Sequence, residues 1–124
     1  MLVVDTNVLF AAACQKDPTH KGALEFLSSN SDELHAPDML KVELMSLLAR
    51  KFDLPIAEAY FKELTSILNF HENAATDILV EYVKHKKTRG CDSFFAYLAD
   101  HLGLKLVSFD QDLVKKTNGI LLRA

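Results

Sequence analysis

Cysteine is scarce in this sequence, and its scarcity excludes two kinds of small protein. Only Cys14 and Cys91 occur among the 124 residues, too few for a disulfide scaffold or a structural zinc site. The histidines are scattered, and no two have the spacing that places a pair of zinc ligands on one helix face: His20, His35, His71, His85 and His101. We therefore expect reduced cysteines that pack inside the fold, and no zinc hydrolase.

Long apolar runs are equally absent. Hydrophobic residues make up 49% of the chain and charged residues 25%, which is typical of a soluble globular protein. The apolar segments are interrupted too often to cross a bilayer, and no basic region or small-residue cleavage site indicates a signal peptide. These features predict a cytoplasmic protein that has no membrane partner.

An excess of positive charge is missing too, since the net charge is −3. Such a balance gives no indication of a nucleic-acid binder. A nuclease that uses divalent cations nevertheless gathers carboxylates at its own site, and the bound cations reverse the local charge. Net charge therefore leaves this class of enzyme open. The length of 124 residues predicts one compact domain over residues 1–124.

The sequence begins with an abrupt change from apolar to polar within MLVVDTNVLF, residues 1–10. An apolar run that ends in a polar triplet is typical of a buried strand that delivers a carboxylate, here Asp5, at its C-terminal end. Open α/β sheets keep their functional sites at that edge. Alternatively, Asp5, Thr6 or Asn7 caps a helix that begins at Val8. On these residues alone both interpretations stay open.

The rest of the chain alternates short apolar segments with amphipathic ones, and Asp17 and Pro18 are interpreted as a helix cap and a first helical residue. Further strands are predicted at residues 33–36, 66–71, 104–108 and 120–122. Helices are predicted at residues 8–14, 18–27, 38–51, from 55 onward, from 75 into the basic run 84–89, and at 91–102, with a polar loop at 28–32. This alternation predicts an α/β fold with a mostly parallel central sheet of four to five short strands flanked by helices.

Four acidic residues stand out by their positions. Asp5 and Asp110 follow predicted strands, Asp92 lies at the start of a helix, and Glu43 lies within an apolar helical stripe. Because parallel strands end at one edge of a sheet, we expect these acids to converge there. Carboxylates in one cleft repel one another and take up protons unless cations neutralise them. Oxygen ligands of this kind suit Mg²⁺ or Mn²⁺.

Each acid also has a simpler interpretation. Asp92 caps its helix, and Asp110 starts a turn with Gln111 and Asp112. Glu43 pairs with a nearby lysine or arginine, since a carboxylate on a core-facing surface needs a partner. The stripe around it consists of Leu40, Leu44, Leu47 and Leu48.

Four segments together resemble a known family: VVDTNVLFAA, PDMLKVELMSLLAR, GCDSFFAYLAD and LKLVSFDQDLVK. They resemble the PIN-domain ribonucleases, and within that family the small VapC-like toxins of prokaryotic toxin–antitoxin pairs, over essentially the whole chain. The resemblance implies that Asp5, Glu43, Asp92 and Asp110 are catalytic acids that bind a metal. Asp112 is a second acid that can share the role of Asp110, and Asp110 is favoured because it lies closer to the strand end.

The resemblance also implies a reaction, the hydrolysis of single-stranded or looped RNA by water that Mg²⁺ or Mn²⁺ activates. Around the acids, Thr6, Asn7, Ser108 and Asp112 would orient carboxylates or bind phosphate. Ser108 stands where the family often has threonine and keeps the hydroxyl. The implied partners are RNA, a second copy of the chain, and an antitoxin whose peptide covers the acidic groove.

Two further groups of residues have alternative interpretations. Lys86, Lys87 and Arg89 either follow the RNA backbone or form a solvated basic helix end stabilised by the helix dipole. Apolar side chains line a dimer surface or, as is more frequent, belong to the core: Met45, Tyr60 and Phe61.

The first polar triplet argues against two other functional classes. A receiver domain needs an adjacent acid pair after the first strand, and a phosphatase of the Asp-x-Asp-x-Thr type needs aspartate where Asn7 stands. Two alternatives therefore remain beside the toxin: a PIN fold that binds RNA or protein without cleaving, and an RNA-processing nuclease outside a toxin–antitoxin pair.

Overall fold

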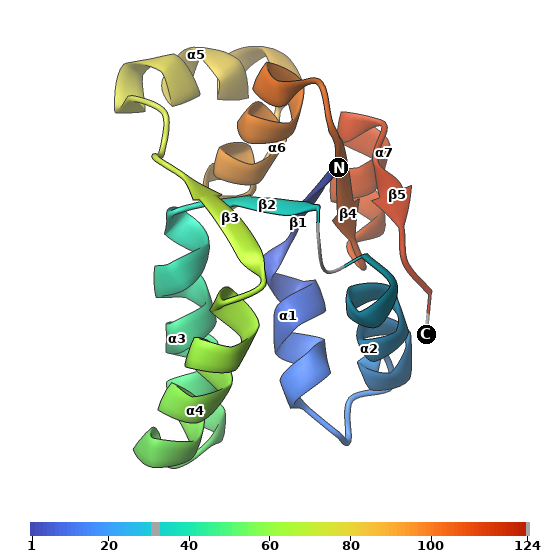
Figure 1. The fold of residues 1–124 in the computed structure, drawn as a ribbon. Coiled ribbons are helices and arrows are strands. Elements are labelled where there is room, and N and C mark those ends of the chain that lie inside the picture. The colour runs from blue at the N-terminus through green and yellow to red at the C-terminus, as the bar shows by residue number, and fades with distance from the viewer. Residues whose placement is uncertain (31–32, 124) are drawn as a thin grey trace.

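The computed structural model describes residues 1–30 and 33–123, and within them a five-stranded sheet has the order β3-β2-β1-β4-β5 (Figure 1). Every neighbouring pair of strands is parallel. The strands are β1 (Leu2–Val4), β2 (Leu34–Pro37), β3 (Leu68–His71), β4 (Lys105–Ser108) and β5 (Ile120–Leu121). The predicted α/β class and parallel sheet are confirmed, and all the predicted strands are present.

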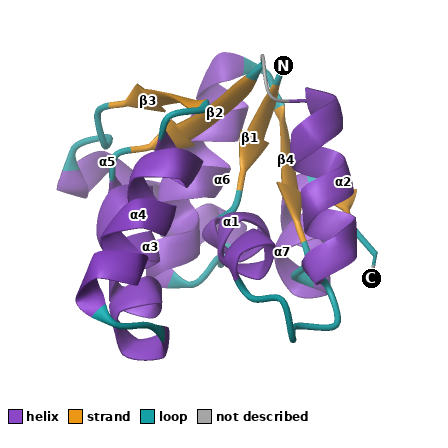
Figure 2. Cartoon of the chain, turned by 60° about the horizontal axis from the view of Figure 1, so that its bottom comes forward, coloured by secondary structure: helices purple, strands orange, loops and turns teal. Residues whose placement is uncertain are grey.

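Helices connect the strands and cover the sheet. They are α1 (Thr6–Ala13), α2 (His20–Asn30), α3 (Met39–Lys51), α4 (Leu54–Thr65), α5 (Thr76–Lys86), α6 (Gly90–Leu102) and α7 (Gln111–Thr117). Figure 1 shows α5 and α6 on one side of β2 and β3, with α3 and α4 on the other side. Figure 2 shows how α1 leaves the end of β1, which is where the polar triplet begins.

The core forms where the central strands meet α1, α3 and α6. Val3 and Val4 of β1 and Leu106 and Val107 of β4 are fully buried, as expected of central strands in a parallel sheet covered on both faces. The helices contribute large buried side chains: Leu9, Leu40, Leu44, Leu48 and Phe95. Of the predicted stripe on α3, only Leu47 is half-buried, and the other three leucines are buried.

Three predictions of local structure are wrong. Helix α2 begins at His20, not at Pro18 as predicted. Asp17 Oδ1 accepts a hydrogen bond from the Thr19 amide at 2.8 Å, which forms a turn before the helix. The predicted polar loop is still helical up to Asn30, and its remaining residues 31–32 lie outside the described residues. The segment after Asp110 is the helix α7, where only a turn was predicted.

The outer residues also differ from some expectations. Cys14 is buried as predicted, whereas Cys91 is exposed and does not pack inside the fold. Met45, Tyr60 and Phe61 are half-buried against the core, as the more frequent interpretation expects. The apolar side chains most open to solvent are others, among them Val42, Leu54 and Val80. In the described part of the chain, no helix is long and apolar enough to cross a membrane.

The turn before β5 makes a close backbone contact that allows no side chain. A Cβ atom added at Gly119 would lie 2.3 Å from the backbone oxygen of Leu106, whereas one added at Gly90 would meet nothing within 4 Å. We expect Gly119→Ala to lower the free energy of unfolding by about 1–3 kcal/mol, because the edge strand must shift. Gly90→Ala is the control and should cost nothing. Urea unfolding measures both, and an equal effect would contradict this assignment.

Candidate active site

Asp5 places its carboxylate in the interior, directly after β1. The residue is 6% exposed, and its backbone amide donates to the Val107 oxygen of β4 at 3.0 Å. Its Oδ2 accepts a hydrogen bond of 2.7 Å from the hydroxyl of Ser108, which is fully buried at the end of the same neighbouring strand. Asp5 is the residue before α1 but makes no side-chain cap to it, so the capping interpretation of this carboxylate is wrong.

Ser108 is the centre of a small hydrogen-bond network. Its oxygen accepts from Asn7 Nδ2 at 3.0 Å and from the Asp110 amide at 2.9 Å. Because both acceptor positions of the hydroxyl are filled, its proton is directed to Asp5. Asn7 Oδ1 in turn accepts from the Phe109 amide at 3.3 Å. The network therefore fixes the orientation of the Asp5 carboxylate from two strands and one helix.

Glu43 lies on the neighbouring helix α3 and has a hydroxyl as its partner. The Thr6 hydroxyl, in the first turn of α1, donates to Glu43 Oε1. Thr6 is buried and Glu43 is half-buried, so this contact joins α1 to α3 beside Asp5. Among the described residues Glu43 has no ion pair with lysine or arginine, and the simpler interpretation of this acid is wrong.

The acids act on one another's protonation. Burial, together with the charges of Asp92 and Glu43, raises the pKa of Asp5 to about 6 against the opposing hydrogen bond from Ser108. Burial also raises the pKa of Asp92, with added repulsion from Asp110 and Glu43. The four acids thus lie in one electrostatic neighbourhood, as expected from their positions in the sequence.

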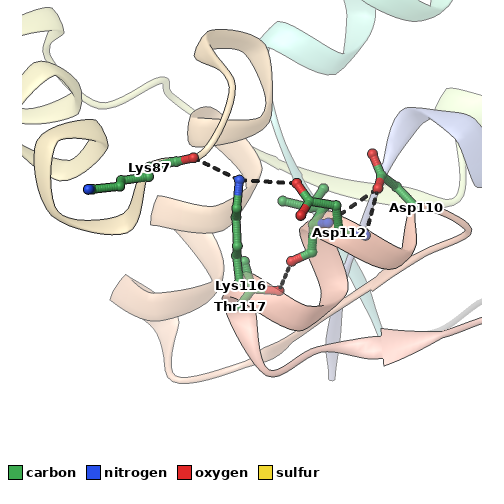
Figure 3. Close-up of polar contacts among 6 residues, drawn as sticks. Lys87, Asp110, Asp112, Lys116 and Thr117 are labelled. Carbon is green, nitrogen blue, oxygen red and sulfur yellow. Dashed lines mark hydrogen bonds and ion pairs between the residues drawn. The ribbon is translucent and has the colours of Figure 1, made fainter.

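Asp92 and Asp110 reach this neighbourhood from the starts of two helices. Asp92 is half-buried in the first turn of α6, whose cap position is occupied by Arg89, so Asp92 is not the cap. Asp110 is the cap of α7, and its Oδ1 accepts from the amides of Asp112 and Leu113 at 3.0 and 3.2 Å (Figure 3). One oxygen of Asp110 is therefore committed to the helix start.

Asp112 differs from Asp110 in its surroundings. Its side chain is 61% exposed, and its Oδ2 forms an ion pair of 3.0 Å with Lys116 Nζ. Lys116 Nζ also donates to the backbone oxygen of Lys87 at 2.9 Å (Figure 3). Sequence reasoning missed Lys116, although its spacing of four residues from Asp112 on one helix is a recognisable signal.

The basic residues considered for RNA binding lie at the connection between α5 and α6. Lys86 ends α5, Lys87 follows it with a positive φ of 57°, and Arg89 precedes α6. All three side chains are exposed, and the charge of Arg89 opposes the rise in the Asp92 pKa. Between them Thr88 is buried, and its hydroxyl has no hydrogen-bond partner in the described structure.

The chemistry of the acids fits a hard divalent cation, although they do not form a closed set of ligands. Within residues 1–30 and 33–123, no three histidine, cysteine or acidic side chains lie close enough together to bind one metal ion. Glu43 is turned to Thr6, and Asp110 to the amides of α7. The donors are all carboxylate oxygens that repel one another, a condition that Mg²⁺ or Mn²⁺ relieves.

Comparison with known proteins assigns the family. The family model described as PIN domain matches residues 2–119. The chain therefore belongs to the PIN-domain family, in agreement with the resemblance seen in the sequence. A comparison with curated proteins finds no match.

Solved structures share the fold at low sequence identity. PAE2754 from Pyrobaculum aerophilum is 22% identical with a TM-score of 0.77, over 97% of this chain and 81% of that one. VapC20 from Mycobacterium tuberculosis, a sarcin-ricin loop cleaving toxin, is 19% identical with a TM-score of 0.77, over 93% and 94%. VapBC2 from Rickettsia felis, bound to a DNA fragment from its promoter, is 17% identical with a TM-score of 0.70, over 97% and 96%.

The burial of Asp5 predicts that the site lowers the stability of the metal-free protein. The folded carboxyl has a pKa of about 6 against an ordinary value of 3.8, so the cost is complete above pH 6 and disappears as the pH falls towards 4. Asp5→Asn, which carries no charge, should therefore raise the free energy of unfolding at pH 7.5 in EDTA by about 1–3 kcal/mol.

Asp17→Asn is the matched control for this prediction. Hydrogen bonds from the Thr19 hydroxyl and amide lower the pKa of Asp17, so its charged form stabilises the fold and its loss should be destabilising at the same pH. Denaturant unfolding at pH 7.5 and pH 4.5 measures both variants. A loss of stability in Asp5→Asn at pH 7.5 would show that its burial is not costly.

Proposed function

We propose that this chain is a ribonuclease dependent on Mg²⁺ or Mn²⁺, and that it is the toxin of a VapBC-type toxin–antitoxin system. The observation that carries the proposal is the carboxylate of Asp5, buried and fixed by Ser108 beside the negative charges of Glu43 and Asp92. Membership in the PIN-domain family supports a nuclease. Acids whose burial and mutual repulsion lower the stability of the fold without a cation are expected where a cation is part of the function.

In this proposal, the metal is held by the four acids Asp5, Glu43, Asp92 and Asp110. When bound, it lowers the pKa of the attacking water and stabilises the negative charge that develops on the phosphate. All the ligands are oxygen atoms, which suits Mg²⁺ and Mn²⁺ better than zinc. To serve as ligands, Glu43 would turn from Thr6, and Asp110 would use the oxygen that does not cap α7.

The surrounding polar residues orient the acids. Ser108, whose hydroxyl accepts from Asn7, keeps one oxygen of Asp5 occupied, so that the other is presented in a fixed direction. Thr6 holds Glu43 close to Asp5 before the metal enters. Asp112 is paired with Lys116 at the edge of the site and is not a ligand in this proposal.

The proposed substrate is single-stranded or looped RNA. The connection that leads into Asp92 exposes the positively charged side chains of Lys86, Lys87 and Arg89, which can bind the phosphates of the RNA backbone. One protein of the same fold, VapC20 from Mycobacterium tuberculosis, is a sarcin-ricin loop cleaving toxin, which supports RNA as the substrate.

The proposed partners are a second copy of the chain and an antitoxin, both in the cytoplasm, and the proposed domain extends over residues 1–124. VapBC complexes with this fold from Rickettsia felis and Salmonella typhimurium support an antitoxin partner. Light scattering tests the homodimer, and a monomeric mass at micromolar concentration would contradict it. A gene for a small DNA-binding protein beside this one would favour the toxin over an RNA-processing nuclease.

Asp92→Asn tests the catalytic proposal against a fold that binds without cleaving. It removes one charged ligand while keeping the side-chain volume, so Mn²⁺-dependent cleavage of single-stranded RNA should fall by at least about a hundredfold. Asp100→Asn is the control on the same helix, because Asp100 is exposed and accepts a hydrogen bond from Tyr82 at 2.7 Å. It should cleave as the unmodified protein does.

Cleavage is followed on a fluorescent RNA with Mn²⁺, Mg²⁺ or EDTA. Cleavage by Asp92→Asn at the rate of Asp100→Asn would remove Asp92 from the catalytic site. RNA binding without any metal-dependent cleavage by the unmodified protein would favour the binding module.

A further inference from the structure

Lys116 joins two segments that lie far apart in the sequence. Its ammonium group contacts the Lys87 backbone oxygen at 2.9 Å and the Asp112 carboxylate at 3.0 Å (Figure 3). The first contact reaches the connection between α5 and α6, and the second stays on α7. The Lys116 side chain keeps 34% of its surface accessible. A charged hydrogen bond of this kind is stronger than one between neutral groups.

The backbone that Lys116 holds has an unfavourable conformation. Lys87 has a φ of 57°, in the left-handed region that side chains other than glycine rarely adopt. Its amide donates to the Val83 oxygen at 2.8 Å, which ends α5, and its oxygen accepts from Lys116. Only Thr88 and Arg89 then separate Lys87 from α6. The position of Arg89 therefore depends on the strained turn at Lys87, whose backbone oxygen is bound by Lys116 of α7.

The Lys116 ammonium also affects the charge at the start of α7, through its ion pair with Asp112. Asp110 caps this helix, and Asp112 in its first turn forms an ion pair with Lys116. Asp112 adds to the negative charge that acts on Asp92, so the ion pair keeps this charge partly balanced. One side chain thus connects the basic turn before Asp92 with the helix start that carries Asp110.

We infer that Lys116 is a positioning residue: it holds the Lys87 backbone against α7 and so keeps Arg89, two residues further on, beside the acidic site where RNA binds. This inference rests on the proposed ribonuclease function. Lys116 itself does not touch the substrate. Its loss should weaken RNA binding because Arg89 loses its fixed position, while the acids that perform the reaction remain.

Lys116→Gln tests the inference in the full chain, with Lys115→Gln as its control. Lys115 lies beside Lys116 on α7 and is exposed, so both variants change the net charge equally. In Lys116→Gln, KM for RNA should rise about threefold to tenfold, with kcat changed less than twofold. Lys116→Arg, whose guanidinium can donate to both partners, should restore KM.

A double variant separates the effect of the Lys116–Lys87 hydrogen bond from the effect of the Asp112 charge. Lys116→Gln leaves Asp112 as an unpaired carboxylate beside the site, and adding Asp112→Asn removes that charge without restoring the contact to Lys87. KM should therefore stay raised in the double variant. A return of KM to that of the unmodified protein would overturn the inference, because the effect would then be one of charge alone.

Hydrogen exchange tests the tether independently of activity. In Lys116→Gln, amide exchange of Lys87 and Ser93, whose N–H groups donate to the oxygens of Val83 and Arg89, should become about fivefold faster, and in Lys115→Gln it should not change. Exchange and KM that are the same in both variants would overturn the inference even if the protein is an active ribonuclease. If the unmodified protein neither binds nor cleaves RNA, the proposed function fails, and the exchange result still decides whether Lys116 holds the turn.

Discussion

Burying the Asp5 carboxylate costs free energy, and the arrangement of the site follows from the hydrogen bonds that hold this carboxylate in place. The Ser108 hydroxyl donates to Asp5, and it is directed there because Asn7 and the Asp110 amide fill its acceptor positions. These hydrogen bonds join β1, α1 and β4 at one point. They stabilise the orientation of the carboxylate without removing its charge, so the fold holds an anion that favours protonation at pH values below about 6.

The acids near Asp5 increase this cost, and the ion pairs of the fold do not relieve it. In the described parts of the chain, the ion pairs are those of Lys41 with Asp38, Lys84 with Glu81 and Lys116 with Asp112. None of them includes Asp5, Glu43 or Asp92. Groups of residues that lower the stability of a fold in this way are expected at functional sites. A divalent cation would convert the repulsion among the carboxylates into binding free energy.

The sequence was sufficient for the features that depend on local pattern. The change from apolar to polar at Asp5 and the stripe around Glu43 predicted where the acids lie, because strand ends and helix faces follow from periodicity. Helix α7 was missed because in its seven residues only Leu113 is buried, which leaves no apolar pattern to detect. The contact of Lys116 with Lys87 spans 29 positions and depends on how α7 packs beside the α5–α6 connection, which no local pattern encodes.

The proposed function requires that the acids around Asp5 bind a divalent cation, and thermal unfolding in Mn²⁺ measures that binding. A ligand that binds only the folded protein raises the unfolding midpoint as its concentration increases. We expect millimolar Mn²⁺ to raise the midpoint of the unmodified protein by several degrees and to leave that of Asp5→Asn nearly unchanged. The same rise in both proteins, or none in the unmodified protein, would show that these acids do not bind the cation.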